Sequence, residues 1–235
     1  MKQINFVRPK QLAWLIDPDK VDFLEQIPEL ADCAGIDYFF VGGSLLKNAF
    51  LQELVRFLKQ HTNIPVILFP GNTLQLVPNV DAVLFLSLIS GRNPEFLIGQ
   101  HVVAAPLVYH YQIPTISVGY ILVDSGKPTS VSYLSHTIPI PANKIDIITA
   151  TALAGQYLGL QNIYLEAGSG AQYSVNPAIV QQLKEVVSVP IWVGGGIQSP
   201  EKMCELFEAG ANLVVIGTAF EQHPTVSFMQ RFKHR

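Results

Sequence analysis

Three short apolar runs in the last third of the chain each end in glycine, and this repetition restricts the fold more than any other feature. The runs cover residues 162–166, 190–193 and 212–216, and helical patterns separate them. They recur at roughly 25-residue intervals, as the strand–helix unit of a β/α barrel requires. The ends are Gly168-Ser169-Gly170, Gly194-Gly195-Gly196 and Gly217-Thr218.

Glycine at a strand end lets backbone N–H groups approach an anion without an intervening Cβ, and a following helix start adds partial positive charge. Three such ends side by side would form a cup for one phosphate group, and barrels usually bind phosphate after strands 7 and 8. A single Gly-Gly-Gly is often only a turn. The regular recurrence therefore carries the prediction of a phosphate site.

The chain has 235 residues, close to the usual length of one eight-stranded β/α barrel, so we expect one domain over residues 1–235. Hydrophobic residues make up 49% of the sequence and charged residues 14%, which suits strands that are buried on both faces. The mean hydropathy of +0.30 is high for a soluble protein. It indicates an exposed apolar groove or a subunit interface.

The formal net charge of −3 offers no basic footprint for nucleic acid, so no nucleic-acid partner is expected. Cys33 and Cys204 lie in helical patterns and resemble neither a disulfide framework nor a metal pair. We interpret them as buried free thiols in a reducing cytoplasm. No apolar stretch is long enough to span a bilayer, which predicts a cytoplasmic protein without a transmembrane segment.

Asp17 stands directly after the first predicted strand, residues 11–16. Side chains at the carboxyl ends of barrel strands face the active-site mouth, whereas an aspartate at a helix start would serve only as an N-cap. Asp19 is better placed for capping, because a helical pattern begins near Val21. We therefore interpret Asp17 as a functional carboxylate and Asp19 as a structural one.

Ser44 follows the glycine pair that ends the second predicted strand, residues 36–41, and brings a hydroxyl next to Asp17. A carboxylate and a serine oxygen on neighbouring strands are hard ligands that suit Mg²⁺, which keeps several waters and takes other oxygens from substrate phosphates. The alternative is an N-cap for a helix over residues 45–60, and the two roles can coexist.

Two connections depart from a regular strand–helix repeat. Residues 73–81, between predicted strands 66–69 and 82–87, are too few and too irregular for a full helix. The barrel is therefore expected to lack its third helix and to leave a groove partly open there. Residues 124–141 are polar and rich in Ser, Thr and Pro, which predicts a long loop over the mouth that acts as a lid.

Six segments, spread in order over nearly the whole chain, carry a resemblance to a known family. They are Leu15-Ile16-Asp17-Pro18-Asp19-Lys20, Val41-Gly42-Gly43-Ser44, Phe69-Pro70-Gly71, Tyr164-Leu165-Glu166-Ala167-Gly168-Ser169-Gly170, Val193-Gly194-Gly195-Gly196-Ile197 and Ile216-Gly217-Thr218. Together they resemble the motif set of the geranylgeranylglyceryl phosphate synthase family, which includes the bacterial heptaprenylglyceryl phosphate synthases. The Tyr-Leu-Glu motif combined with the first-strand Asp-Pro-Asp is the specific part of the match.

The resemblance implies a modified TIM barrel that transfers a prenyl group from a prenyl diphosphate to the 3-hydroxyl of sn-glycerol 1-phosphate, with Mg²⁺ as cofactor. It also implies that an extended segment replaces the third barrel helix. Asp17 and Ser44 match the family's metal-binding positions. The positions that match its glycerol phosphate site are Tyr164, Leu165, Glu166, Ala167, Gly168, Ser169, Gly170, Gly195, Gly196, Gly217 and Thr218.

The implied reaction suggests chemical roles for Tyr164 and Glu166 on the sixth predicted strand, which we state as a hypothesis. Mg²⁺ on Asp17 would neutralise the leaving diphosphate while the glycerol hydroxyl attacks the cation-like allylic carbon. Glu166 would accept the hydroxyl proton, and Tyr164 would orient the acceptor. Both residues are therefore expected to be catalytic.

Leu15 bears on the donor, because bacterial heptaprenyl members commonly carry lysine two positions before the metal aspartate. Leucine is more similar to the archaeal-type pattern, so we expect a C20 donor, geranylgeranyl diphosphate; a longer heptaprenyl donor is the alternative. Family members range from dimers to hexamers, so the resemblance implies a homo-oligomer. A lipid product also implies transient membrane contact.

Two other readings of the residues stay open at this stage. Phosphosugar isomerases share a phosphate cup at strands 7 and 8, and Asp17 with Asp124 could supply their acid–base pair. That reading leaves the Tyr164-Leu165-Glu166 motif unexplained. A barrel that only binds a phosphorylated or lipidic ligand would need one of the two predicted sites and not both.

Overall fold

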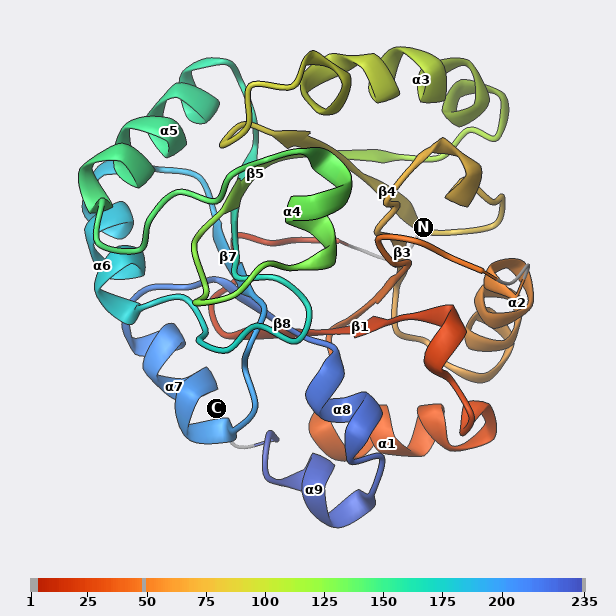
Figure 1. Cartoon of the computed structure of the whole chain (residues 1–235). Coiled ribbons are helices and arrows are strands. Elements are labelled where there is room, and N and C mark those ends of the chain that lie inside the picture. The colour runs from red at the N-terminus through yellow and green to blue at the C-terminus, as the bar shows by residue number, and fades with distance from the viewer. Residues whose placement is uncertain (1–3, 48–49, 234–235) are drawn as a thin grey trace.

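Eight parallel strands close into a barrel in sequence order, with β1 paired to both β2 and β8 (Figure 1). The computed structural model describes residues 4–47 and 50–233. The predicted TIM-type barrel is confirmed. The strands are β1 (Gln11–Ile16), β2 (Tyr38–Val41), β3 (Val66–Leu68), β4 (Ala82–Leu88), β5 (Thr115–Leu122), β6 (Asn162–Glu166), β7 (Ile191–Gly194) and β8 (Leu213–Ile216).

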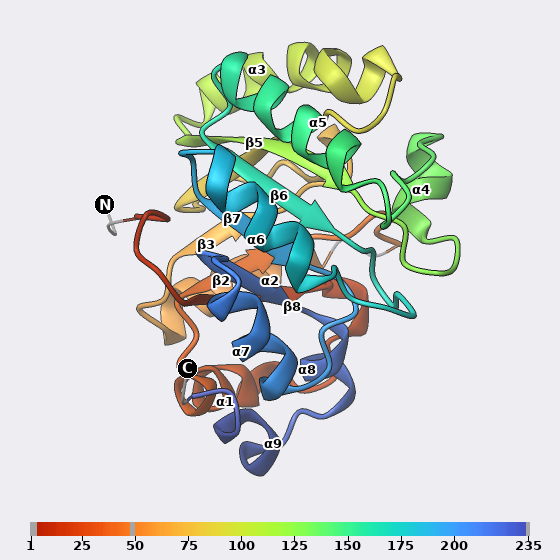
Figure 2. The same cartoon turned by 90° about the vertical axis from the view of Figure 1, so that its left-hand side faces the viewer.

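Helices surround the barrel, and the side view of Figure 2 shows α5, α6 and α7 packed in a row along its flank. A single π-helical turn, η4 (Glu95–Gly99), leads into α3. None of the helices within residues 4–47 and 50–233 is both long and apolar enough to cross a membrane. The α-helices are α1 (Ile27–Ala34), α2 (Leu51–His61), α3 (Gln100–His110), α4 (Ser130–Ser135), α5 (Ile145–Tyr157), α6 (Pro177–Val186), α7 (Pro200–Glu208), α8 (Thr218–Gln222) and α9 (Val226–Gln230).

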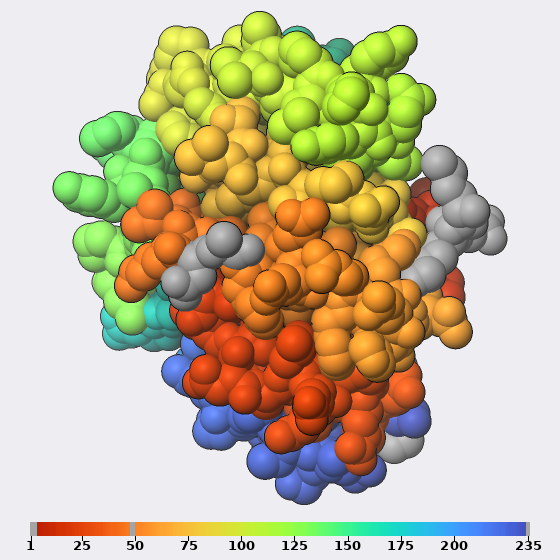
Figure 3. Space-filling view, turned by 90° about the vertical axis from the view of Figure 1, so that its right-hand side faces the viewer, coloured from red at the N-terminus to blue at the C-terminus, as the bar shows by residue number. Residues whose placement is uncertain are grey.

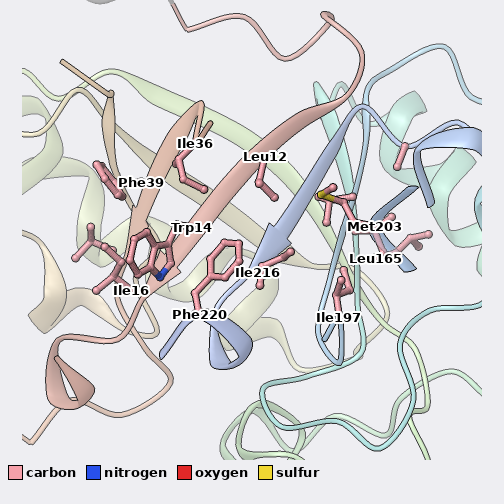
Figure 4. Packing of buried hydrophobic residues seen from close by; sticks show 14 of the residues in the cluster. Leu12, Trp14, Ile16, Ile36, Phe39, Leu165, Ile197, Met203, Ile216 and Phe220 are labelled. Carbon is pink, nitrogen blue, oxygen red and sulfur yellow. The ribbon is translucent and has the colours of Figure 1, made fainter. Parts of the chain in front are cut away.

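The core has two layers, because successive strand residues point to opposite sides of the barrel wall. On β2, Phe39 packs outward against the helices and Phe40 packs inward. Trp14 belongs to the outer layer and meets Phe220 edge to face at 5.5 Å (Figure 4). Trp192 fills the barrel interior. Burial on both faces explains the continuous apolar runs of the sequence.

The third barrel helix is absent, as expected. Only a 3₁₀ turn, η3 (Thr73–Gln75), lies between β3 and β4. The buried side chain of Gln75 substitutes for part of the missing packing: it donates to the Gly43 carbonyl at 2.7 Å and accepts from the Gly71 N–H at 3.1 Å. Figure 3 shows this flank, where the gold β3–β4 segment lies directly beside the yellow-green α3.

Two predicted helix starts are wrong. Asp19 does not cap a helix at Val21; its carboxylate accepts from the Lys47 N–H at 2.6 Å, and α1 begins only at Ile27. Ser44 is not an N-cap either, because α2 begins at Leu51. The expected helix over residues 45–60 also includes residues 48–49, which lie outside the described part.

The predicted loop over residues 124–141 contains a short helix, α4, which stands in front of the barrel mouth (Figure 1). A capping box starts it: Thr129 accepts from the Ser132 N–H, and the Ser132 hydroxyl accepts from the Thr129 N–H. This short-range hydrogen bonding needs no apolar periodicity, which is why the pattern of the segment did not indicate a helix.

Cys33 and Cys204 are free thiols, as expected, but each is only partly buried.

Candidate active site

The loops after β6, β7 and β8 meet at one side of the barrel mouth. The Ala167 N–H donates to the Gly194 carbonyl at 3.0 Å, which extends the β6–β7 pairing into the loops. The hydroxyls of Ser169 and Thr218 lie 3.3 Å apart and join the β6 and β8 loops. The predicted phosphate cup therefore has three converging backbone segments. We use that name for Ser169, Gly170, Gly195, Gly196, Gly217 and Thr218, all of which line one cavity of about 810 Å³.

Gly195 is the position where the cup depends most on glycine. Its φ is +83°, and a Cβ there would lie 2.5 Å from both the Glu166 Oε1 atom and the Gly168 nitrogen. Gly196 follows with a φ of +68°. A side chain at either position would be strained; at Gly195 it would displace the Glu166 carboxylate, and at Gly196 it would press on the backbone of Tyr173 and Ser174.

Glu166, at the end of β6, is a buried carboxylate with 5% of its surface exposed, and it lines the same cavity. Its Oε1 atom accepts from the Gly168 N–H at 2.6 Å. Burial raises the pKa of Glu166 above its ordinary value of 4.5, although contacts with Tyr164, Gly168 and Tyr120 partly oppose the shift. A carboxylate of raised pKa beside a ligand cavity is a suitable general base.

Two tyrosines flank this carboxylate. Tyr120 and Tyr164 are register partners on β5 and β6, and their rings meet edge to face at 5.1 Å. Burial, and then the nearby charge of Glu166, raises the pKa of both well above 10.0, so both stay protonated. Among the described residues, the Tyr164 hydroxyl has no hydrogen-bond partner of good geometry, although Glu166 is close enough to shift its pKa. It is a buried donor that a ligand hydroxyl would satisfy.

Asp17, at the end of β1 next to β8, is held from two directions. Its Oδ1 atom accepts from the Asp19 N–H at 3.1 Å, and its Oδ2 atom forms an ion pair with Lys20 at 2.8 Å. Glu221 of α8 accepts from the Asp17 N–H at 3.2 Å and lies 3.6 Å from the Lys20 ammonium. Glu221 therefore connects the β1 loop to the helix that follows the phosphate cup.

The charges in this cluster are interdependent. Burial lowers the pKa of Lys20, but Asp17 and Glu221 outweigh that effect and hold the pKa above its ordinary value of 10.5. Burial raises the pKa of Glu221 despite the opposing charge of Lys20. At neutral pH Lys20 is a firmly charged cation at the mouth, which suits a diphosphate group.

Asp17 and Ser44 line the mouth cavity together, and the Asp17 carboxylate lies against Gly43, where a Cβ would be 3.3 Å from Oδ1. Two protein oxygens beside a cavity fit a Mg²⁺ ion that takes its other ligands from water and phosphate. Within residues 4–47 and 50–233, no group of three or more His, Cys, Asp or Glu side chains could hold a metal unaided.

An apolar groove leaves the mouth between the β3–β4 segment and α3. Most of its lining is apolar and comes from β4 and from residues such as Phe69, Phe96 and Ala104. Its polar lining residues include Asn72, Thr73 and Ser135, together with Gln100 and His101 on α3. The groove exists because no helix covers this flank. Both cavities share the residues at their junction, which are Gly43, Ser44, Phe69, Tyr120, Val131 and Leu134.

The structure brings most of the expected site residues to one cavity. Asp17, Ser44, Tyr164, Glu166 and the whole phosphate cup line it. Leu165, Ala167 and Gly168 do not: the Leu165 side chain packs in the outer core (Figure 4), and the other two act through their backbone N–H groups.

Sequence reasoning did not single out Tyr120, Lys20 or Glu221. Strand alternation could have placed Tyr120 inside the barrel, but its distance from Glu166 depends on strand register. Glu221 lies 204 residues from Asp17, and no local pattern predicts that contact.

Asp124 lies apart from this site. It is exposed, caps its own turn by accepting from the Gly126 N–H at 3.0 Å, and does not line the mouth cavity with Asp17. The pair of Asp17 and Asp124 that the isomerase reading named therefore does not face one cavity.

The fold and this mouth define the class of the chain as a β/α barrel that has a glycine-lined cup suited to a phosphate group and an apolar groove beside it. Comparison with known proteins narrows the class. Residues 5–233 match the PcrB family, and the chain belongs to this family.

Its relatives are geranylgeranylglyceryl phosphate synthases. That of Spirosoma linguale is 48% identical over 218 residues, 92% of this chain and 87% of its own. That of Pyrococcus abyssi is 38% identical over 233 residues, 98% of this chain and 89% of its own. The crystal structure of the Thermoplasma acidophilum synthase in complex with substrate sn-glycerol-1-phosphate has a TM-score of 0.90 at 33% identity, and the match covers 97% and 93% of the two chains.

A thiamine phosphate pyrophosphorylase from Pyrococcus furiosus matches with a TM-score of 0.58 at 12% identity, which is a likeness of fold alone.

Replacement of Gly195 by alanine is expected to weaken phosphate binding by roughly tenfold or more, because the Cβ would displace Glu166 and the Gly168 N–H. Titration with inorganic phosphate, followed by phosphorus NMR, measures this. Gly159→Ala is the matched control: its φ is +88°, but a Cβ there meets nothing within 4 Å. The control should lose about 1 kcal/mol of stability and no phosphate affinity. Equal affinity losses in both variants would contradict the assignment.

Proposed function

We propose that this chain is a prenyltransferase that moves a geranylgeranyl group from geranylgeranyl diphosphate to the 3-hydroxyl of sn-glycerol 1-phosphate. The observation that carries the proposal is the junction of two unlike cavities: a polar mouth with a phosphate cup and an apolar groove that opens beside Tyr120. An acceptor phosphate bound in the mouth and a prenyl tail bound in the groove would come together at this junction. The synthase names of the relatives, and the sn-glycerol-1-phosphate in the related crystal structure, support it.

The phosphate cup is the proposed site of the acceptor phosphate, held by backbone N–H groups and by the Ser169 and Thr218 hydroxyls. The glycerol backbone would then extend toward Glu166 and Tyr164. The unsatisfied Tyr164 hydroxyl donates to an acceptor oxygen, and Glu166 receives the proton of the attacking hydroxyl. Positioning by fixed backbone groups loses little entropy during the reaction.

The transfer breaks the allylic carbon–oxygen bond of the donor, whose electron pair leaves with diphosphate, and forms a carbon–oxygen bond to the acceptor. Asp17 and Ser44 would hold Mg²⁺, which neutralises charge on the diphosphate when bound. Lys20 adds a fixed positive charge beside it. Since Lys20 pairs with Asp17, metal binding requires either that this ion pair weakens or that the Asp17 carboxylate contacts both Lys20 and the metal.

The donor is proposed to be C20. Leu15 lines the mouth cavity where heptaprenyl members commonly carry lysine, and the compared relatives bear the geranylgeranyl name. The heptaprenyl alternative would need the groove to extend past Gln100 and His101, the polar residues that line it on α3.

We also propose that the protein is a cytoplasmic homo-oligomer, either a dimer or a hexamer. Exposed apolar side chains on and beside α3 support self-association, because Ile98, Val102 and Val103 are each at least 60% exposed. The two free thiols fit a reducing compartment.

Purified protein should move radiolabelled sn-glycerol 1-phosphate into an organic phase when given Mg²⁺ and geranylgeranyl diphosphate. EDTA should stop the transfer and excess Mg²⁺ restore it, because the diphosphate needs the metal to leave. Parallel incubations with C15 and C35 donors report chain-length preference. Folded protein that labels no lipid with any donor would contradict the proposal. Activity that survives EDTA would contradict only the proposed requirement for Mg²⁺.

Glu166→Gln should lower turnover about 10²- to 10⁴-fold, the usual range for loss of a general base. Because burial raises the pKa of Glu166, the value of kcat/KM in the wild type should fall on the acid side at a pH above 4.5, the ordinary pKa of a glutamate.

The same shift predicts the stability of this variant. A raised folded-state pKa means that the wild type loses stability as pH rises through it. At neutral pH the glutamine variant should therefore have an unfolding temperature no lower than that of the wild type. The difference between the two unfolding temperatures should shrink as pH falls. The exposed Glu208→Gln is the control and should change neither property. Retained turnover in Glu166→Gln would refute its role as base.

A further inference from the structure

The barrel mouth carries exposed apolar side chains that the proposed reaction does not use. Leu74 is 92% exposed, Tyr133 78%, Leu45 61% and Leu134 40%. They come from the β2–α2 connection, the β3–β4 segment and α4. We call these four residues the apolar rim.

The rim surrounds the place where the two cavities join. Leu45, Tyr133 and Leu134 line the polar mouth, and Leu134 also lines the apolar groove. Leu74 follows Thr73, which lines the groove at the opposite wall. The carboxyl ends of the strands face the viewer in Figure 1, and α4 lies foremost there. In the side view of Figure 2, α4 projects beyond the rest of the barrel.

The segments that carry the rim contain lysines and no carboxylates, while Asp19, which accepts from the Lys47 N–H, and the exposed Asp124 lie next to these segments. Residues 44–47, 70–76 and 125–138 contain no aspartate or glutamate, although the chain has 18 acidic residues. These same segments carry Lys47 and Lys127, both exposed, and the exposed His136. Apolar side chains that project from a mouth, on segments that carry lysines and no carboxylates, are complementary to a surface of anionic lipids.

We propose that the apolar rim docks this chain on an anionic lipid bilayer, so that the groove opens onto the membrane. The inference rests on the proposed function, because a prenyl diphosphate donor and an ether-lipid product are amphiphiles whose tails partition into a bilayer. Docking at the rim lets a tail pass between bilayer and groove without crossing water.

A second copy of the chain is the rival occupant of this surface. A copy seated on the rim would cover the mouth and obstruct both the polar cavity and the groove. The exposed apolar side chains of α3 also offer a lateral surface for self-association that leaves the mouth open. The geometry therefore favours the bilayer.

The test is sedimentation with vesicles of phosphatidylcholine mixed with phosphatidylglycerol, and with phosphatidylcholine alone. The wild type should bind the anionic vesicles, bind the neutral ones more weakly, and lose affinity as salt rises. The double variant Leu74→Ser and Tyr133→Ser should have a vesicle partition coefficient at least roughly tenfold lower, because two apolar side chains would be removed from the interface.

The matched control is the double variant Val7→Ser and Leu158→Ser. These residues are 73% and 80% exposed, and they lie near the start of β1 and at the end of α5, away from the mouth. Thermal melts verify that both double variants fold. The control should bind vesicles as the wild type does.

Equal loss of vesicle binding in both double variants would overturn the proposal. So would a wild type that transfers prenyl groups in solution yet ignores anionic vesicles, a result that leaves the proposed function intact. If sedimentation velocity shows that the rim variant alone dissociates an oligomer, the rim is a contact between copies and the bilayer assignment is wrong.

Discussion

The close approach of the β6 and β7 loops is the constraint on which the rest of the site depends. The Ala167 N–H bonds to the Gly194 carbonyl, the Gly168 N–H bonds to the Glu166 carboxylate, and Gly195 leaves no Cβ between them. A buried carboxylate and exposed backbone amides can coexist here only because the carboxylate is tied down by one of those amides. The barrel supplies this arrangement through strand register, so the site is fixed before any ligand arrives.

The omission of one helix has an equally large effect. In a regular barrel, a helix between β3 and β4 would fill the flank that the groove occupies. Gln75 compensates for its absence by bonding to the ends of β2 and β3, which keeps Gly43 and Ser44 in place at the mouth. The absence of this helix thus creates an apolar binding surface, while Gln75 preserves the polar one. An amphiphilic ligand is what such a pairing suits.

Much of this could be predicted from the sequence, and the failures have identifiable causes. Glycine-ended strands at a regular spacing indicated the barrel and the phosphate cup, because both follow from local backbone rules. The predicted start of α1 was wrong, since Asp19 bonds to the distant Lys47 N–H and does not cap a helix; the predicted start of α2 after Ser44 was also wrong, because α2 begins at Leu51. Tyr120 and Glu221 were missed because their contacts with Glu166 and Asp17 depend on the closed barrel. Local patterns predict elements, whereas contacts across the mouth require the fold.

A preformed backbone cup should recognise the acceptor phosphate without help from a metal. Isothermal titration of EDTA-treated protein with sn-glycerol 1-phosphate tests it most directly, with sn-glycerol 3-phosphate as the stereochemical comparison. We expect saturable binding of sn-glycerol 1-phosphate without metal, and weaker binding of its enantiomer because Tyr164 and Glu166 lie on one side of the cup. Binding that appears only after Mg²⁺ is added would contradict it.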